Sequence, residues 1–338
     1  MKLDSIFSDH MVFAENLPIR IFGSGAGSGE IRFLGEKAEA RSDGERWAAE
    51  LQPRAAGGPY ELEVTLDGET RVFSDVYVGR VFLIAGQSNA EFPLCQSNTS
   101  EELYRSDACL RNYFVSRPWI PQEALSSEDG WLPAEKDRVG AWSALGYLAG
   151  RSVRTATGKA VGIISCYQGA SVIESWLPKS IAEGARLPDS EVYIDHWYPE
   201  FTTWNANSVI YETMLSTVMP FSVNKVVWYQ GESDTTVQEA AIYDKSAAAL
   251  FNCIRRLQRN DGLGFVLVQI ADYDHRKEND PDGWKGIQEA QERASAADPL
   301  VTLVRSADIC ESSMIHPVTK NALAERIAAA LLRDRDAS

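Results

Sequence analysis

The sequence has few of the residues that build disulfide frameworks and metal sites. It contains 5 cysteines in 338 residues, scattered and without a C-x-x-C pair, which favours reduced, mostly buried thiols over disulfides or a zinc site. Histidine is scarcer still, with 4 residues, and no group of His, Asp and Glu has the spacing of metal ligands. The sequence therefore indicates neither a metal site nor a cofactor.

Positive charge and long apolar runs are also in short supply. The 33 Lys and Arg against 48 Asp and Glu give a formal net charge of −15, and such a field repels the phosphate backbone of nucleic acids. No apolar run approaches the roughly 20 residues of a membrane-spanning helix, and residues 1–10 contain no long apolar segment typical of a signal peptide. We therefore expect no nucleic-acid or membrane partner and a cytoplasmic location.

Residues 1–75 predict a small β-sandwich-like domain. Short apolar stretches separated by turns fill this part, and 60–66 alternates between polar and apolar residues before the turn signal Asp67-Gly68. No nucleophile and base stand close together here, so we expect a structural or flanking role.

Residues 76–338 alternate between strand and helix patterns, which predicts an α/β domain with a mostly parallel sheet covered on both faces. Strands are expected at 81–85, 110–115, 160–166, 225–229, 264–270 and 300–304. Helices are expected at 141–157, 207–218, 238–258, 284–297 and 318–333.

A serine follows the first of these strands. The apolar run 81–84 leads into Ala85-Gly86-Gln87-Ser88, which leaves the Ser88 hydroxyl at the carboxyl end of a strand, where open α/β sheets place their chemistry. A nucleophilic serine needs such a sharp turn, with backbone N–H groups aimed at the developing oxyanion. The same pattern also occurs in ordinary turns whose serine is structural, and these residues alone do not separate the two interpretations.

Further polar stretches follow later strands at 168–171, 230–234 and 315–320, and all would face the same edge of the sheet as Ser88. A serine hydrolase needs a nucleophile, oxyanion donors and a base brought together from separate loops. Of the histidines, His10 lies in the β part, His196 in an aromatic loop and His275 in a charged loop. His316, just before the last helix, is therefore the candidate base.

Four sequence blocks around these candidate residues resemble those of a known family. They are, in order, Gly86-Gln87-Ser88-Asn89, Gly169 with Ile173-Glu174-Ser175-Trp176, Trp228-Tyr229-Gln230-Gly231-Glu232-Ser233-Asp234, and His316-Pro317 with Lys320. Their order and content are similar to those of the sialate O-acetylesterases, which are SGNH-type carbohydrate esterases close to acetyl xylan esterases. The resemblance extends to Ser8-Asp9-His10-Met11-Val12 and Gly57-Gly58-Pro59-Tyr60 and so covers nearly the whole chain. It implies an SGNH-hydrolase-like three-layer α/β/α sandwich over residues 76–338.

The resemblance also implies roles for individual residues. Ser88 would be the nucleophile and His316 the general base and acid, acting through an acetyl-serine intermediate. The backbone N–H groups of Ser88 and Gly169, with the side-chain amide of Gln230, would form the oxyanion hole. Asn89 fits either a binding role in the site or packing within the turn. The implied substrate is an acetylated carbohydrate, with sialic acid as the family's default.

The sequence departs from the family pattern before the histidine. Family members usually carry Asp two or three residues earlier, where Ser313 and Met314 stand here. Glu232 is the substitute that we favour as the orienting acid, and it also fits a structural carboxylate. Glu311 and Asp308 are the alternatives for the orienting acid, and a backbone carbonyl is an alternative for part of this role.

Two smaller departures concern the substrate. Ala90 stands where Met is usual, and Gln168-Gly169-Ala170-Ser171 stands where Trp-Gly-Gly-Thr is common. Acetylated xylan is therefore an alternative substrate. A non-catalytic carbohydrate-binding protein that lacks a complete triad is an alternative of a different class, and the aromatic residues between 176 and 204 fit either a sugar-binding surface or the packing of a long loop.

Overall fold

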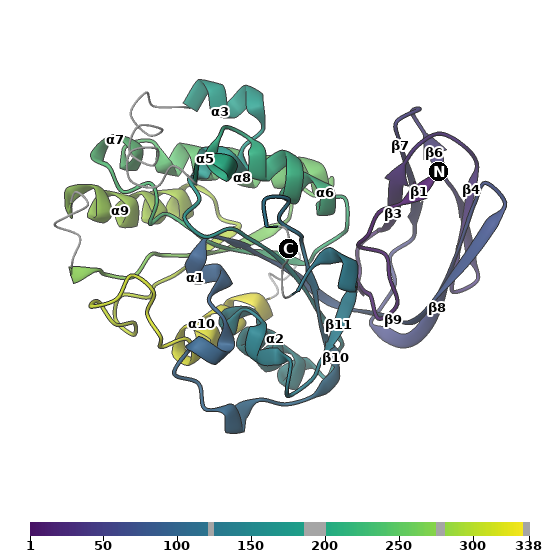
Figure 1. The fold of residues 1–338 in the computed structure, drawn as a ribbon, viewed down its shortest axis with the longest axis horizontal. Coiled ribbons are helices and arrows are strands. Elements are labelled where there is room, and N and C mark those ends of the chain that lie inside the picture. The colour runs from purple at the N-terminus through teal and green to yellow at the C-terminus, as the bar shows by residue number, and fades with distance from the viewer. Residues whose placement is uncertain (121–124, 186–200, 275–280, 334–338) are drawn as a thin grey trace.

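The computed structural model describes residues 1–120, 125–185, 201–274 and 281–333. Figure 1 shows a group of strands at the N-terminal end and a larger part in which helices lie on both sides of a twisted sheet. Within the described residues, no helix combines the length and the apolar character needed to cross a membrane.

Short strands build the N-terminal part. Their bounds are β1 (Lys2–Leu3), β2 (Val12–Ala14), β3 (Ile19–Ser24), β4 (Gly29–Phe33), β5 (Glu36–Glu39), β6 (Arg41–Ser42), β7 (Arg46–Leu51) and β8 (Gly57–Leu66). One sheet has the order β1-β3-β7-β6. Every second residue of β7, namely Trp47, Ala49 and Leu51, is buried, as expected for a strand with one face on a core.

The central sheet carries the strands of the larger part. These are β9 (Glu69–Gly86), β10 (Asp107–Phe114), β11 (Trp131–Ala134), β12 (Val161–Tyr167), β13 (Lys225–Tyr229), β14 (Gly264–Val268) and β15 (Val301–Val304). They lie in the order β11-β10-β12-β9-β13-β14-β15. Neighbours from β10 to β15 are parallel, and only the edge strand β11 runs antiparallel. The sequence did not predict β11, which is short and contains Pro133, a residue that sheets tolerate at an edge.

Strand β9 belongs to both parts of the molecule. It has 18 residues; the first half pairs antiparallel with β8, and the second half pairs parallel with β12 and β13. The strands therefore form one mixed sheet of 11 strands. The α/β class is confirmed, but a mostly parallel sheet behind a separate all-β domain is not established, because one strand serves both parts. The predicted domain boundary between residues 75 and 76 lies within β9 and stays a prediction.

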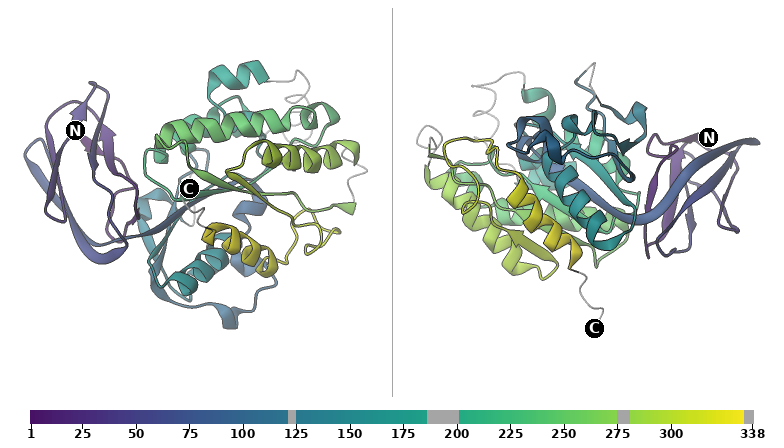
Figure 2. Two further views of the ribbon diagram at one scale, coloured as in Figure 1. Left: turned by 180° about the vertical axis from the view of Figure 1, so that it is seen from behind. Right: turned by 90° about the horizontal axis from the view of Figure 1, so that it is seen from below.

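Helices cover both faces of the central sheet. They are α1 (Ser88–Glu91), α2 (Ala144–Thr157), α3 (Lys179–Ala185), α5 (Thr202–Asn205), α6 (Ser216–Val218), α7 (Val237–Ala240), α8 (Tyr243–Gln258), α9 (Pro281–Ala297) and α10 (Asn321–Leu332). Helices α2 and α10 lie side by side on one face, and α8 and α9 lie on the other (Figures 1 and 2).

Two of the predicted helices differ in detail from the structure. The helix expected at 238–258 is divided into α7 and α8, and the one expected at 207–218 is a π-helical segment, Tyr211–Leu215, followed by α6. Helix α2 has a capping residue at each end. The Ser143 hydroxyl accepts a hydrogen bond from the Gly146 N–H, and Gly158 ends the helix at a φ of 68°.

Candidate active site

Ser88 begins helix α1 directly after strand β9, on a turn that requires glycine. Gly86 has a φ of 135°, and a Cβ at this position would lie 2.0 Å from the Tyr229 carbonyl oxygen. The N–H of Gln87 donates to that same carbonyl at 3.0 Å, and its side-chain oxygen accepts from the N–H of Gly231 at 3.2 Å. The turn that presents Ser88 is therefore held against strand β13 and the loop that follows it.

His316 lies beside Ser88 although 228 residues separate them. Its Nε2 atom is 2.8 Å from Ser88 Oγ, and both side chains are half-buried. Burial lowers the pKa of His316, and the nearby charge of Lys320 lowers it further. The neutral imidazole, the form that can accept a proton from a hydroxyl, is therefore favoured at neutral pH.

The loop after β12 brings Gly169 close to Ser88. A Cβ at Gly169 would lie 3.6 Å from Ser88 Cβ, so the absence of a side chain leaves room beside the serine. Hydrogen bonds hold the loop in place on both sides of this glycine. Gln168 accepts a hydrogen bond from Trp119 Nε1 at 2.8 Å, and the Ala170 carbonyl accepts one from Asn205 Nδ2 at 2.8 Å.

Ala170 has a φ of 51°, in the left-handed region. A non-glycine residue there costs about 1 kcal/mol, so Ala170→Gly is expected to raise the free energy of unfolding by up to about 1 kcal/mol. Urea denaturation of the purified variant measures this. The matched control is Ala156→Gly, at an exposed position in helix α2, which is expected to lower stability by about 1 kcal/mol. Equal losses in both variants would contradict the assigned strain at Ala170.

The Gln230 side-chain amide is hydrogen-bonded to groups other than Ser88. Its side chain is fully buried, and its Nε2 atom donates to the Ser171 carbonyl at 2.8 Å and to the carboxylate of Asp234. Its Oε1 atom accepts from the Tyr243 hydroxyl at 2.8 Å. Both amide hydrogens thus have partners, so Gln230 could donate to an oxyanion only by giving up one of them. Its role as an oxyanion donor stays a prediction.

Asn89 and Glu232 contact each other beneath the serine turn. Asn89 Nδ2 donates to Glu232 Oε1 at 2.7 Å and to the carbonyl of Ile315 at 2.9 Å. Among the described residues, Asn89 thus links the Glu232 carboxylate to the backbone of the histidine loop by hydrogen bonds. Its second carboxylate oxygen is buried, without a hydrogen-bond partner among the described residues, and burial raises the pKa of this carboxyl group.

No carboxylate of the described residues forms a hydrogen bond with His316. Of the two runners-up, Glu311 accepts from the backbone and hydroxyl of Thr319, and Asp308 pairs with Arg326. Ser313 and Met314, which occupy the usual aspartate positions, are exposed. The described residues thus contain a Ser–His pair, whereas a directly bonded third member is not among them.

Sequence reasoning placed Lys320 in a motif but assigned it no role in the site. The structure buries this lysine completely, with Nζ 2.9 Å from Asn89 Oδ1. A signal was available, because Lys320 directly precedes a helix whose residues are mostly apolar. The aromatic residues Tyr193, Trp197 and Tyr198, considered for sugar binding, lie outside the described residues.

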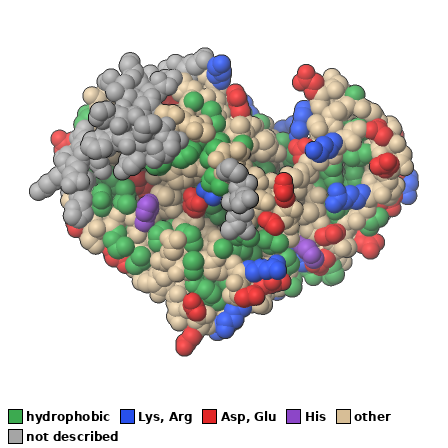
Figure 3. Space-filling model, viewed as in Figure 1, with side chains coloured by type: hydrophobic (Ala, Val, Ile, Leu, Met, Phe, Trp, Pro, Cys, Tyr) green, Lys and Arg blue, Asp and Glu red, His purple; other side chains and the backbone are tan. Residues whose placement is uncertain are grey.

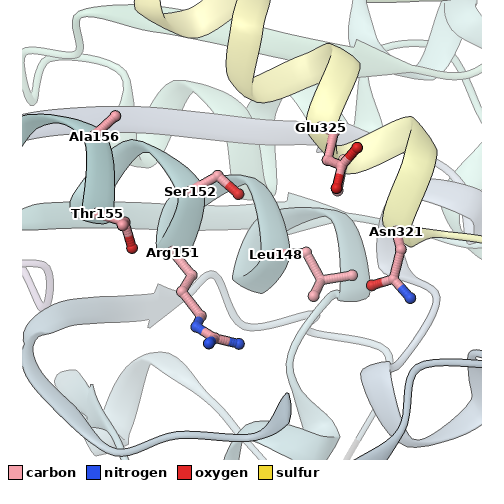
Figure 4. Close-up of a pocket in the computed structure, with 8 residues that line it drawn as sticks. Leu148, Arg151, Ser152, Thr155, Ala156, Asn321 and Glu325 are labelled. Atoms are coloured by element: carbon pink, nitrogen blue, oxygen red, sulfur yellow. The ribbon is translucent and has the colours of Figure 1, made fainter.

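Two cavities lined by described residues lie away from the predicted site residues. One of about 360 Å³ lies between helices α2 and α10 (Figure 4), and one of about 1120 Å³ lies between strands β3 and β7 and the end of α8. Figure 3 shows the surface hollowed between the N-terminal strands and the larger part, with basic side chains nearby. None of the predicted site residues lines either cavity.

Comparison with known proteins places this geometry among carbohydrate esterases. The family described as "Carbohydrate esterase, sialic acid-specific acetylesterase" matches residues 78–333. The human sialate O-acetylesterase is 24% identical over 330 residues, covering 88% of this chain and 62% of the human protein, and the mouse protein is 25% identical over 245 residues, covering 61% and 45%. The chain thus spans less than two thirds of the length of these curated relatives.

A solved structure is similar over almost the whole chain. The crystal structure of a carbohydrate acetylesterase from Xanthomonas citri superposes with a TM-score of 0.82 at 28% identity. The match covers 97% of this chain and 74% of the Xanthomonas chain. The similarity therefore includes the N-terminal strands as well as the part that carries Ser88 and His316.

Proposed function

Because the chain belongs to the carbohydrate esterase family of sialic acid-specific acetylesterases, we propose that it is a serine esterase that removes O-acetyl groups from carbohydrate. The observation that carries the proposal is the 2.8 Å contact between His316 Nε2 and Ser88 Oγ. A serine becomes a useful nucleophile when an adjacent base takes its proton as it attacks.

The proposed reaction proceeds in two halves. His316 Nε2 takes the proton of Ser88 Oγ while that oxygen attacks the acetyl carbonyl carbon, and the carbonyl oxygen becomes an oxyanion. The tetrahedral intermediate collapses, the bond to the sugar oxygen breaks, and His316 protonates the departing sugar hydroxyl. Water then gives a proton to His316 and attacks the acetyl-serine, and collapse of this second intermediate releases acetate and restores Ser88.

Backbone N–H groups are the proposed oxyanion donors. Ser88 lies at the start of helix α1 and Gly169 lies beside it, and donors of this kind stabilise an oxyanion by about 3 kcal/mol each in other hydrolases. Gln230 remains a proposed third donor that would have to change partners. Glu232 is proposed to support the histidine indirectly, through Asn89 and the Ile315 carbonyl.

The proposed substrate is O-acetylated sialic acid or another acetylated glycan, with acetylated xylan as the alternative. The relatives named sialate O-acetylesterase and the Xanthomonas carbohydrate acetylesterase support an acetylated sugar. The finer architecture belongs to the same proposal, namely an SGNH-type three-layer α/β/α sandwich over residues 76–338 preceded by a small β domain over 1–75. A cytoplasmic location also stays a prediction.

A second candidate function is non-catalytic carbohydrate binding. The observation that favours it is that no carboxylate of the described residues is bonded to His316. The Ser–His contact argues against it, because a pure binding site has no need for a hydroxyl held on an imidazole.

Acetate release by the purified protein distinguishes the two. We expect turnover of p-nitrophenyl acetate and release of acetate from an O-acetylated sialoside or from acetylated xylan, and the faster of the two glycans identifies the substrate class. If no acetate is released from any of them while one of the glycans binds, the esterase proposal is wrong and the binding function is favoured.

A further inference from the structure

Lys320 is a buried cation next to the proposed catalytic pair. Its exposure is 0%, and lysine is almost never fully buried without a partner. Its Nζ atom donates to Asn89 Oδ1 at 2.9 Å and lies 4.7 Å from the centre of the Phe92 ring. The ring of Tyr229 lies on another side, at 6.0 Å. These contacts bring the ammonium group against Asn89, the residue that follows Ser88.

The Asn89 amide uses all of its hydrogen-bonding groups in this position. Its oxygen accepts from Lys320, and its nitrogen donates to Glu232 and to the Ile315 carbonyl. The reverse orientation would place the amide nitrogen against an ammonium group and the amide oxygen against two acceptors. Lys320 therefore fixes which way the amide points.

This orientation connects the two halves of the site. Asn89 directly follows Ser88 in the chain, and Ile315 directly precedes His316. The hydrogen bond from Asn89 to the Ile315 carbonyl thus ties the serine turn to the histidine loop, one residue away from the contact between Ser88 and His316.

We propose that Lys320 is a positioning residue, which holds the Asn89 amide so that it fixes the His316 loop against Ser88 and takes over the supporting role that an orienting carboxylate has elsewhere. The inference rests on the proposed esterase function. Lys320 acts on the site through its hydrogen bond to Asn89, and its assigned role requires no contact with the serine.

The charges around Lys320 make its interaction with Asn89 dependent on pH. The titratable groups that face it are Tyr229 at the end of β13, Glu232 from the loop after β13, and Cys310, Glu311 and His316 from the segment between β15 and α10. Burial lowers the pKa of Lys320 to about 8, although Cys310, Glu232 and Glu311 act in the opposite direction and raise it. The positive charge is therefore present below about pH 8 and is lost as the pH rises above it. In its charged form Lys320 also lowers the pKa of His316.

The variant Lys320→Met tests the proposal with the wild-type enzyme alongside. Loss of the amide's anchor is expected to lower kcat for p-nitrophenyl acetate by about 10- to 100-fold, the size of effect that a small misplacement of catalytic groups produces, with little change in KM. The acid limb of the kcat/KM profile should move to higher pH, because the imidazolium of His316 is no longer disfavoured by a neighbouring cation. We expect the activity of the wild type to decline above about pH 8, where Lys320 loses its charge. This decline should be absent from the variant.

Lys225→Met is the matched control. Lys225 Nζ donates to the Ala330, Leu331 and Arg333 carbonyls at the other end of the same helix, α10, so this variant removes a lysine that supports the helix without touching Asn89. Its pH profile should match that of the wild type. If Lys320→Met fails to fold, Lys320→Gln, which keeps a polar group without the charge, takes its place in the same measurements.

An unchanged kcat and pH profile in a folded Lys320 variant, with an active wild type, would overturn the positioning role and leave the esterase function intact. A wild type that releases no acetate would instead remove the proposed function. The two failures are therefore distinguishable in one set of assays.

Discussion

Replacement of Ser88 by alanine is expected to lower kcat/KM for acetyl-ester hydrolysis by at least about 10⁴-fold, the scale on which the loss of a nucleophile acts in serine hydrolases. Only the hydroxyl group is removed, and among the described residues its hydrogen-bond partner is His316 Nε2 at 2.8 Å. Without it no acetyl-serine forms. Initial rates on p-nitrophenyl acetate measure the loss, and mass spectrometry of the quenched reaction should find an acetyl adduct on the wild type that is absent from the variant.

Ser42→Ala is the control for removal of a serine hydroxyl. Ser42 lies exposed in strand β6, where its hydroxyl donates to the carbonyls of Gly25 and Arg46. We expect it to retain wild-type activity. Ser88→Ala turnover within about 10-fold of the wild type would show that another group attacks the ester, and the assigned nucleophile would have to be abandoned.

Replacement of His316 by asparagine is expected to have an effect of similar size, a loss of about 10⁴-fold in kcat/KM, because the side chain that takes the Ser88 proton is gone. The double variant of Ser88 and His316 should be no slower than either single variant, since the two groups act as a unit. His10→Asn is the matched control. This histidine also has a hydrogen-bond partner, with Nδ1 2.7 Å from Asp75 Oδ2, but lies in the N-terminal part.

The pH profile of the wild type tests the same histidine. Burial and the charge of Lys320 lower the pKa of His316 below its ordinary value of 6.5. The base is therefore neutral and active down to a lower pH than an exposed histidine would be, and on the acid side kcat/KM should begin to fall only below pH 6.5. An acid limb centred well above pH 7 would contradict this, because it would require a nearby negative charge that stabilises the imidazolium.

Local sequence was sufficient to place the turn that carries Ser88. A buried apolar strand followed by glycine and small polar residues predicts a sharp strand-to-helix turn, and the structure shows one, with Gly86 packed against the Tyr229 carbonyl. The candidate base could also be chosen from the sequence, because histidine is scarce and His316 stands where a loop leads into the last helix. The family follows from the ordered blocks, and the family match over 78–333 confirms it.

The extent of β9 could not be read from local patterns. A strand continues for as long as it finds hydrogen-bonding partners, and β9 has β8 on one part and β12 and β13 on the other. The arrangement of the whole sheet decides which strands those partners are. The sequence pattern changes near residue 76 because β9 exchanges one set of neighbouring strands for another there, and the strand itself continues.

The hydrogen bonds that support the proposed catalytic pair were likewise decided by tertiary structure. The sequence analysis favoured Glu232 as the acid for the histidine, with Glu311 and Asp308 as alternatives, but all three lie in loops, whose partners a local pattern does not predict. In the structure the Asn89 amide donates a hydrogen bond to Glu232, which is 143 residues away in the sequence. The same amide accepts a hydrogen bond from Lys320, which is 231 residues away. The sequence by itself determined the family, the strand-to-helix turn of Ser88 and the choice of His316, because apolar patterns and glycine act over a few residues. Only the tertiary structure decided which buried polar groups are partners, because in a closed interior each donor must take whichever acceptor the packed loops bring within reach.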